Sequence, residues 1–241
     1  SIRRQRQMCI RDRYSTTALD KQTITGGLEY YRESLFSDKF ETGVKENKSQ
    51  WYATAFLQDD WSINKQFSVI AGLRCDYHEK YGTNLTPKAS VMYKIFPFTV
   101  RFNYARGYRS PSIKELYMNW DHLGMFWIYG NSKLKPETNN YISLSGEYVN
   151  SWININANVY SNWFRNKIEG MWSNDQTELH YINIGKSRLA GVETMCKIQI
   201  NRHINVHGAY NYLYTSKDAD GVRLSSSSPH SGNIRAEYNT R

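Results

Sequence analysis

The feature that most constrains this chain is a run in which apolar and polar side chains alternate one residue at a time. Its apolar members are Ile153, Ile155, Ala157, Val159 and Trp163, and the residues between them are Asn154, Asn156, Asn158, Tyr160 and Asn162. Successive side chains of a β-strand point to opposite faces, so the run predicts a strand with one aliphatic and one amide-rich face. Such a strand suits a wall between lipid and water, and equally a soluble β-sandwich.

Weaker alternating runs recur along the chain, and the connections between them differ in length in a regular way. Those near residues 63, 95, 151 and 202 are short, those at 34–49, 78–86, 108–138 and 215–231 are long, and one near 175 is intermediate. Antiparallel strands joined in this order place the short turns on one rim and the long loops on the other. We therefore predict an all-β fold, an antiparallel transmembrane β-barrel, and we count roughly ten strands.

Composition is compatible with a membrane barrel and with a secreted β-protein. The mean hydropathy is −0.69 and 40% of the residues are apolar, but strands with one polar face lower the average of a barrel to the same level. No apolar run of about 18 residues is present, which excludes a membrane-spanning helix. Aromatic residues make up 15% of the chain, and Tyr and Trp are favoured at membrane interfaces. A soluble carbohydrate-binding β-sandwich remains the alternative.

The formal net charge of +9 does not indicate nucleic-acid binding. Five arginines and one aspartate lie in residues 1–13, and the other charges are scattered, without a basic stripe among stacking aromatics. The segment Met8–Arg13 resembles the translation of an adapter used in DNA library preparation, and it lacks the apolar stretch of a signal peptide. We interpret residues 1–13 as foreign and expect the fold to occupy residues 14–241.

No side-chain arrangement typical of an enzyme or a metal site stands out. Asp59 and Asp60 are adjacent, so on a strand their carboxylates point to opposite faces and cannot act on one substrate atom. Cys75 and Cys196 continue the apolar rows of their strands and show no metal-binding spacing. An outer-membrane protease or lipase would need a Ser or an Asp/His group gathered at the external rim. No spacing supports such a group, so we predict that the protein is not an enzyme.

Several segments resemble the TonB-dependent receptors of bacterial outer membranes. They are residues 104–117 (YARGYRSPSIKELY), 55–61 (AFLQDDW), 71–77 (AGLRCDY), and Tyr181–Asn183 followed by Gly191–Glu193. The resemblance implies a receptor in the outer membrane of a Gram-negative bacterium that binds a scarce nutrient at its external loops. Import would use energy from the TonB complex, acting through a plug domain. It also implies that residues 14–241 are part of the barrel, roughly ten strands of a larger barrel of about 22, with the plug and the remaining strands absent.

We expect the ligand at the long connection between residues 108 and 138. The segment Tyr108–Pro111 resembles the first sequence box of the haem-importing receptors, with Ser for Ala, and Asn131–Leu134 resembles the second, without its Pro. His122 lies between them, and neutral imidazole suits haem iron. The predicted ligand-binding residues are His122, as a haem-iron ligand, with Tyr108, Arg109, Trp120, Met125, Trp127 and Asn131. The alternative is a solvated loop histidine among aromatic residues that cap the barrel mouth.

The predicted cargo is an iron chelate, haem or a ferric siderophore, which is transported and not kept as a cofactor. Importers of cobalamin or an oligosaccharide are the alternatives, because pockets of such receptors are assembled from many loops and the plug. The implied partners are the TonB complex, outer-membrane lipid and the small-molecule cargo. Whether a surface lipoprotein is a further partner is left open. Because an unclosed barrel leaves two hydrogen-bonding edges bare, we predict that the piece does not fold alone.

Overall fold

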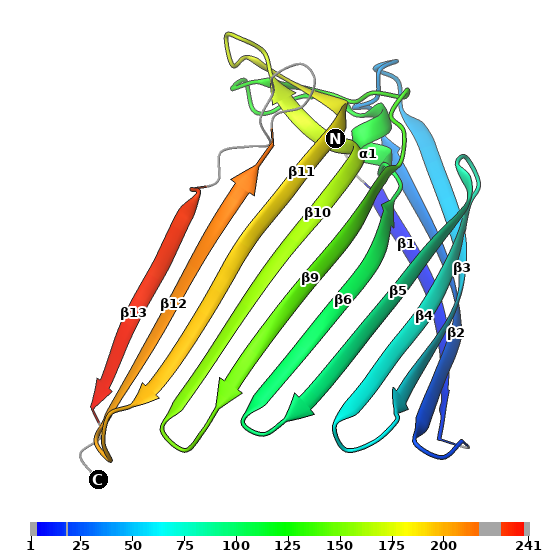
Figure 1. Ribbon diagram of the computed structural model, residues 1–241. Coiled ribbons are helices and arrows are strands. Elements are labelled where there is room, and N and C mark those ends of the chain that lie inside the picture. Colours follow the sequence, from blue (N-terminus) through cyan, green and yellow to red (C-terminus); the bar gives the residue numbers. More distant parts are fainter. Residues whose placement is uncertain (1–3, 18, 217–227, 239–241) are drawn as a thin grey trace.

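The structure, a computed structural model, describes residues 4–17, 19–216 and 228–238, and it consists of one curved antiparallel sheet (Figure 1). Eleven wall strands follow one another in chain order, each paired with the next. They are β1 (Arg4–Thr16), β2 (Gln22–Ser37), β3 (Glu46–Ser62), β4 (Phe67–His78), β5 (Gly82–Ile95), β6 (Phe98–Arg109), β9 (Glu137–Val149), β10 (Ile153–Trp172), β11 (Glu178–Gln199), β12 (Ile204–Thr215) and β13 (His230–Tyr238). The predicted antiparallel all-β architecture is confirmed.

One wall strand was not expected, because β1 lies in the segment that we excluded from the fold. Its residues pair with β2 from Arg4 opposite Phe36 to Thr16 opposite Ile24. The prediction that residues 1–13 lie outside the sheet is therefore wrong. A ladder uses backbone N–H and C=O groups that every non-proline residue carries, so an arginine-rich sequence can pair with the edge of β2. The foreign origin of the segment stays a prediction.

Several strands continue beyond the ends that the alternation predicts. The loop expected at 78–86 is reduced to residues 79–81, and the one expected at 34–49 to residues 38–45. Strands β10 and β11 are 20 and 22 residues long, about twice the 9–11 residues that span a bilayer. Outside the hydrocarbon a ladder needs no apolar face, so polar residues remain paired there. The short turns still share one rim, and the long connection 110–136 lies on the other (Figure 1).

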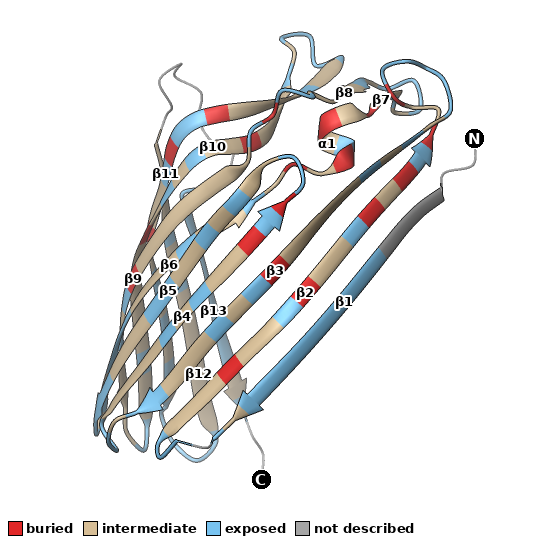
Figure 2. Cartoon of the chain, turned by 90° about the vertical axis from the view of Figure 1, so that its right-hand side faces the viewer, coloured by how far each residue is buried: buried red, intermediate tan, exposed pale blue. Residues whose placement is uncertain are grey.

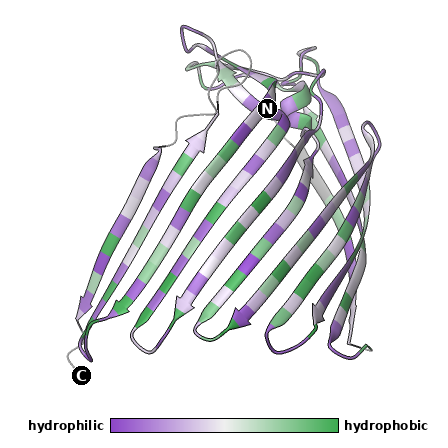
Figure 3. Ribbon diagram, in the orientation of Figure 1, coloured by the Kyte–Doolittle hydropathy of each residue, from purple (hydrophilic) through white to green (hydrophobic). Residues whose placement is uncertain are grey.

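Hydrophobic and hydrophilic residues alternate along the strands (Figure 3), and the pairing places them on opposite faces of the wall. Phe102, Leu144 and Val159 are cross-strand neighbours on the convex face, and all three are exposed. On the concave face polar side chains bond across strands: Ser90 donates to Asn103 (2.7 Å), which donates to Ser143 (3.0 Å). In the described part of the chain these apolar rows pack on no second sheet, so the fold is not a β-sandwich.

The buried hydrophobic core lies at the rim of the long connections. We call residues 110–136 the mouth loop; its helix α1 (Ile113–Tyr117) sits in the hollow of the sheet (Figure 2). One buried cluster contains Leu35, Phe40, Ile113 and Met118, and a second contains Leu116, Leu134 and Ile168. The mouth loop thus contributes more than half of these side chains and is anchored by their burial. No helix among the described residues is long and apolar enough to cross a bilayer.

Adjacent substitutions on β10 test the assignment of the two faces. Val159→Arg places a cation on the convex face, 55% exposed at this position, and we expect it to lower the free energy of unfolding by about 2–4 kcal/mol in a bilayer. Asn158→Arg is the matched control, because Asn158 is on the concave face and donates to Glu193 (3.2 Å); we expect a change below about 1 kcal/mol. Urea unfolding of the complete receptor in lipid vesicles measures both values. Equal losses would contradict the assignment.

Candidate functional site

The mouth loop begins with a short capped helix. Ser112 Oγ accepts a hydrogen bond from Glu115 N (3.3 Å), and the Glu115 carboxylate accepts one from Ser112 N (2.8 Å). This capping box satisfies otherwise unpaired N–H groups and fixes the start of α1. Five residues do not make a stable helix by themselves, so the burial of Ile113 and Leu116 holds it in place.

Arg109, one of the predicted ligand-binding residues, joins the mouth loop to the wall. Its guanidinium donates to both carboxylate oxygens of Glu115 (2.9 and 3.1 Å) and to Glu137 (3.4 Å). Both carboxylates have side chains that are only 15% exposed, and a mostly buried charge without a partner is costly. The structure therefore places Arg109 in the attachment of the loop, with two acids already bound.

Further hydrogen bonds attach the mouth loop to both sides of the curved sheet. They run from Gln50 to Pro111 O (3.4 Å), from Tyr81 to Leu134 O (3.1 Å), from Asn131 to Tyr181 O (3.1 Å) and from Asn183 to Lys135 O (2.9 Å). Burial raises the pKa of the Tyr81 phenol to about 12, so this group keeps its donating proton at neutral pH. Asn131, another predicted site residue, is likewise part of the attachment.

Gly130 allows two parts of the mouth loop to approach closely. Its N–H donates to Met118 O (2.7 Å). A Cβ atom at this position would lie 2.8 Å from Tyr117 N and 2.9 Å from Met118 N, both backbone atoms. Any side chain here would therefore force the helix and the returning segment apart.

The tip of the mouth loop is a hairpin of β7 (Asn119–Asp121) and β8 (Trp127–Tyr129), and β8 also pairs in parallel with β11. Leu123 and Gly124 adopt positive φ angles of 55° and 75° in its turn, and Asp121 accepts a hydrogen bond from Gly124 N (2.9 Å). Met125 lies in this turn and is 64% exposed.

His122 is enclosed by its aromatic neighbours. Its ring is stacked on Phe126 at 4.9 Å and meets the edge of Trp120 at 5.0 Å. Its Nδ1 atom is buried without a hydrogen-bond partner. Lys39 covers the Trp120 ring at 4.6 Å. Trp127 is stacked on Tyr129 at 6.1 Å. Trp120 and Phe126 thus contact His122, whereas Trp127 contacts Tyr129. Iron ligation by His122 stays a prediction.

The seven predicted residues therefore fall into three places. Arg109 and Asn131 attach the loop, while Trp120, His122, Met125 and Trp127 belong to the hairpin. Tyr108 lines a pocket of the wall below. Within the described residues no group of three or more His, Cys, Asp or Glu side chains is arranged to hold a metal ion.

This pocket, which we call the mouth pocket, has a volume of about 290 Å³. It is lined by Tyr52, Arg74, Asp76, His78, Tyr108, Arg109 and Ser110. Two buried atoms in it lack a hydrogen-bond partner, Tyr108 Oη and His78 Nε2. Lys80 N donates to His78 Nδ1 (3.1 Å), so in the neutral ring the proton is on Nε2. The residues that line the pocket therefore include two buried donors without a partner, and such groups call for a ligand or partner.

His78 was missed by the sequence analysis because its spacing to other ligand-type residues is unremarkable. The available signal was its position at the end of an alternating run, on the same face of the strand as Gly72, Arg74 and Asp76. The structure makes His78 1% exposed and packs its ring 4.9 Å from Tyr81. His78 stands out in the structure because it is a polar residue buried on the concave face. No sequence pattern predicts this burial.

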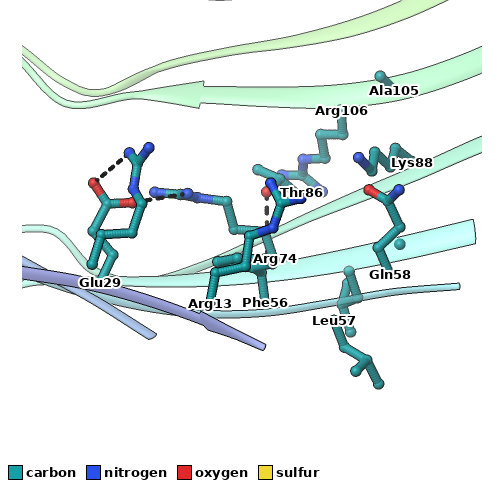
Figure 4. A pocket seen from close by; sticks show the side chains of 13 residues that line it. Arg13, Glu29, Phe56, Leu57, Gln58, Arg74, Thr86, Lys88, Ala105 and Arg106 are labelled. Atoms are coloured by element: carbon teal, nitrogen blue, oxygen red, sulfur yellow. Dashed lines mark hydrogen bonds and ion pairs between the residues drawn. The ribbon is translucent and has the colours of Figure 1, made fainter. Parts of the chain in front are cut away.

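A second cavity on the concave face, the basic pocket, has a volume of about 370 Å³ and shares Arg74 with the mouth pocket (Figure 4). Its charged lining residues are Arg11, Arg13, Glu29, Arg74, Lys88 and Arg106. Glu29 pairs with Arg11 (3.0 Å) and Arg74 (3.4 Å). Among the described residues, Lys88 and Arg106 have no ion-pair partner. The wall below the mouth pocket is therefore cationic.

A family described as TonB dependent receptor-like, beta-barrel, matches residues 7–241. The chain belongs to the TonB-dependent receptor family. It is 25% identical to the iron-regulated outer membrane virulence protein of Vibrio cholerae, a match that covers 83% of the chain and 33% of that protein. It is 30% identical to the vitamin B12 transporter of the same species, over 72% of the chain and 26% of the transporter. The receptor chain thus spans about a third of the length of these relatives or less.

Solved receptor structures share the fold. The ferric enterobactin receptor of Pseudomonas aeruginosa superposes with a TM-score of 0.84 at 18% identity, over 99% of this chain and 40% of that one. The siderophore receptor of Acinetobacter baumannii gives 0.80 at 19% identity, over 99% and 41%. As a member of this family, the receptor is an outer-membrane protein of a Gram-negative bacterium. Its relatives are receptors and transporters, which supports a role other than catalysis.

Removal of the Arg109 guanidinium should loosen the mouth loop. Arg109→Met keeps much of the side-chain length but leaves Glu115 and Glu137 mostly buried without their cation, so we expect the loop to become at least about tenfold more sensitive to protease. Arg165→Met is the control, since Arg165 is an exposed arginine on β10. Limited proteolysis of the complete receptor in outer-membrane vesicles, followed by mass spectrometry, locates the cuts. Unchanged cleavage within residues 110–136 would contradict the proposed attachment.

Gly130 provides an independent test of the loop. Gly130→Ala should destabilise the packed loop by about 1–3 kcal/mol, because the new methyl group meets backbone atoms that cannot rotate away. Gly185→Ala on β11 is the control, as an added Cβ there meets nothing within 4 Å. The same proteolysis assay reads both variants, and equal protection would show that the close approach is not needed.

Proposed function

We propose that this receptor imports a ferric siderophore, which binds at the external loops and passes inward with energy supplied by TonB through a plug domain. The names of several relatives support an iron-chelate cargo. They include the iron-regulated protein of Vibrio cholerae and the ferrienterobactin receptor of Escherichia coli, the latter 24% identical over 86% of this chain and 33% of its own length. In this proposal the chain supplies part of the wall and part of the outer mouth.

The observation that carries the proposal is the pair of unsatisfied donors in the mouth pocket. The N–H of His78 and the O–H of Tyr108 belong to side chains that line the mouth pocket with Arg74 and Arg109. Both guanidinium groups also pair with carboxylates of the chain, Arg74 with Asp76 and Glu29 and Arg109 with Glu115 and Glu137. Oxygen atoms that bind ferric iron in a siderophore carry negative charge, and charge-assisted hydrogen bonds to such atoms are the stronger kind. The pocket therefore suits an oxygen-rich anionic group better than a neutral apolar one.

The basic pocket supports the same cargo. Lys88 and Arg106 line it without a carboxylate partner among the described residues, and a lumen wall of one sign attracts and guides ions of the other. An anion released from the mouth pocket would meet this cationic surface next. Arg74, which lines both cavities, would contact it in either position.

Tyr108→Phe is the sharpest test, because it removes only the hydroxyl group. That hydroxyl has no partner within the protein, so the substitution should leave the free energy of unfolding unchanged or slightly higher. Affinity for ferric enterobactin, used as the probe, should fall roughly tenfold, the size expected for one hydrogen bond to a charged group. Tryptophan fluorescence quenching of the complete receptor measures the affinity. Tyr93→Phe is the control, since Tyr93 is an exposed tyrosine on the convex face.

A second substitution and two other cargoes complete the test. His78→Phe keeps the ring packing on Tyr81 but removes the N–H, and it should weaken binding of the probe by a similar factor. Cobalamin and haem are measured in parallel, with His122→Ala included for haem. Binding of cobalamin or haem without binding of ferric enterobactin would overturn the proposal. So would an affinity for ferric enterobactin that neither Tyr108→Phe nor His78→Phe changes.

A further inference from the structure

An arginine lies in a largely apolar groove on the convex face. This groove, the outer groove, has a volume of about 680 Å³ and lies over β6 and β9 to β12. Its large side chains include Phe102, Leu144, Val159, Trp163, Tyr212 and Tyr214, and Arg188 stands at one end of it. An arginine that faces lipid is costly at the bilayer midplane, but the cost nearly vanishes at the interface.

The register of β11 places Arg188 at that interface. From Leu189 opposite Thr215 to Gln199 opposite Asn205, β11 and β12 form eleven consecutive residue pairs. This length matches the 9–11 residues of a tilted strand that crosses the hydrocarbon. Arg188 is the next residue toward the rim of the long loops, so its side chain lies at the level of the outer-leaflet head groups. Trp163, Tyr212 and Tyr214 nearby are exposed, as expected of an interfacial aromatic belt.

The guanidinium is held in position but not neutralised. Arg188 Nε donates to Ser161 Oγ (2.8 Å), and the guanidinium carbon lies 5.2 Å from the centre of the Trp163 ring. The backbone is fixed as well, because Arg188 N donates to Ser216 Oγ (2.8 Å). Over the described ranges no carboxylate lies within ion-pair distance of Arg188. Within the described residues its terminal nitrogens therefore have no carboxylate to bind.

We propose that the outer groove is a binding site for a phosphate-bearing lipid of the outer leaflet. Its phosphate would accept hydrogen bonds from the terminal nitrogens of Arg188, and an acyl chain would lie along Val159, Leu144 and Phe102. Phosphate is the anion present at this depth of a bilayer, and a planar guanidinium suits its geometry. The apolar groove runs from the arginine toward the membrane interior, which is how the two parts of a lipid are arranged. A cation and an apolar groove together select a lipid over a free anion.

The test compares two lipids with the same chains, dioleoylphosphatidic acid and dioleoylglycerol. Native mass spectrometry of the complete, delipidated receptor in detergent counts the molecules of each that are retained. The wild type should retain phosphatidic acid more strongly than dioleoylglycerol. Arg188→Gln should weaken phosphatidic acid binding about tenfold, equivalent to about 1.4 kcal/mol, and leave dioleoylglycerol binding unchanged. Arg188→Lys should retain part of the preference, because it keeps the charge and loses the bond to Ser161.

Matched variants separate the site from general effects of charge. Arg101→Gln removes an exposed arginine from β6 on the concave face and should leave the preference intact. If Arg188→Gln fails to fold, Trp163→Leu, which removes the ring beneath the guanidinium, should reduce the preference severalfold. Equal retention of the two lipids by the wild type, an unchanged preference in Arg188→Gln, or displacement by millimolar inorganic phosphate would each overturn the proposal.

Discussion

The continuous ladder of backbone hydrogen bonds from β1 to β13 is the interaction on which the rest of this receptor depends. In hydrocarbon no water is available to backbone groups, so each N–H and C=O must be paired by a neighbouring strand. With the backbone paired, the side chains need only suit the surroundings of each face, which are lipid on one side and water on the other. Aliphatic and aromatic side chains such as Phe102, Leu144 and Val159 lie on the convex face. Most amides, hydroxyls and charges lie on the concave face, where Ser90, Asn103 and Ser143 are bonded to one another. Few wall side chains are fully buried, because the wall separates two solvents and encloses no dry interior.

The mouth loop is stabilised in a different way, by burial of apolar side chains and by ion pairs. Ile113, Leu116, Met118 and Leu134 form most of the buried core, and Arg109 ties α1 to β9 through two carboxylates. A long connection is thereby fixed inside the hollow of the sheet, above the mouth pocket and the basic pocket. The proposed import function would use this arrangement, since the mouth pocket and the basic pocket are adjacent and share Arg74.

The site was less predictable than the wall for a physical reason. A strand face follows from alternation, which is local in sequence, whereas a pocket depends on which distant strands contribute to it. Tyr108 was identified from a sequence box, but His78 comes from β4 and becomes conspicuous only when burial leaves its Nε2 without a partner. Arg109 and Asn131 belong to the same boxes, yet their partners Glu115 and Tyr181 give them a role in holding the loop.

The sequence by itself determined the strand class, the antiparallel order, the two faces and the family, because a period of two and the alternation of turn lengths are local properties. Only the tertiary structure decided where each strand ends, that residues 4–16 pair with β2, and which side chains of the mouth loop are buried. Those outcomes depend on backbone pairing and packing between residues far apart in the chain, and no local pattern specifies them.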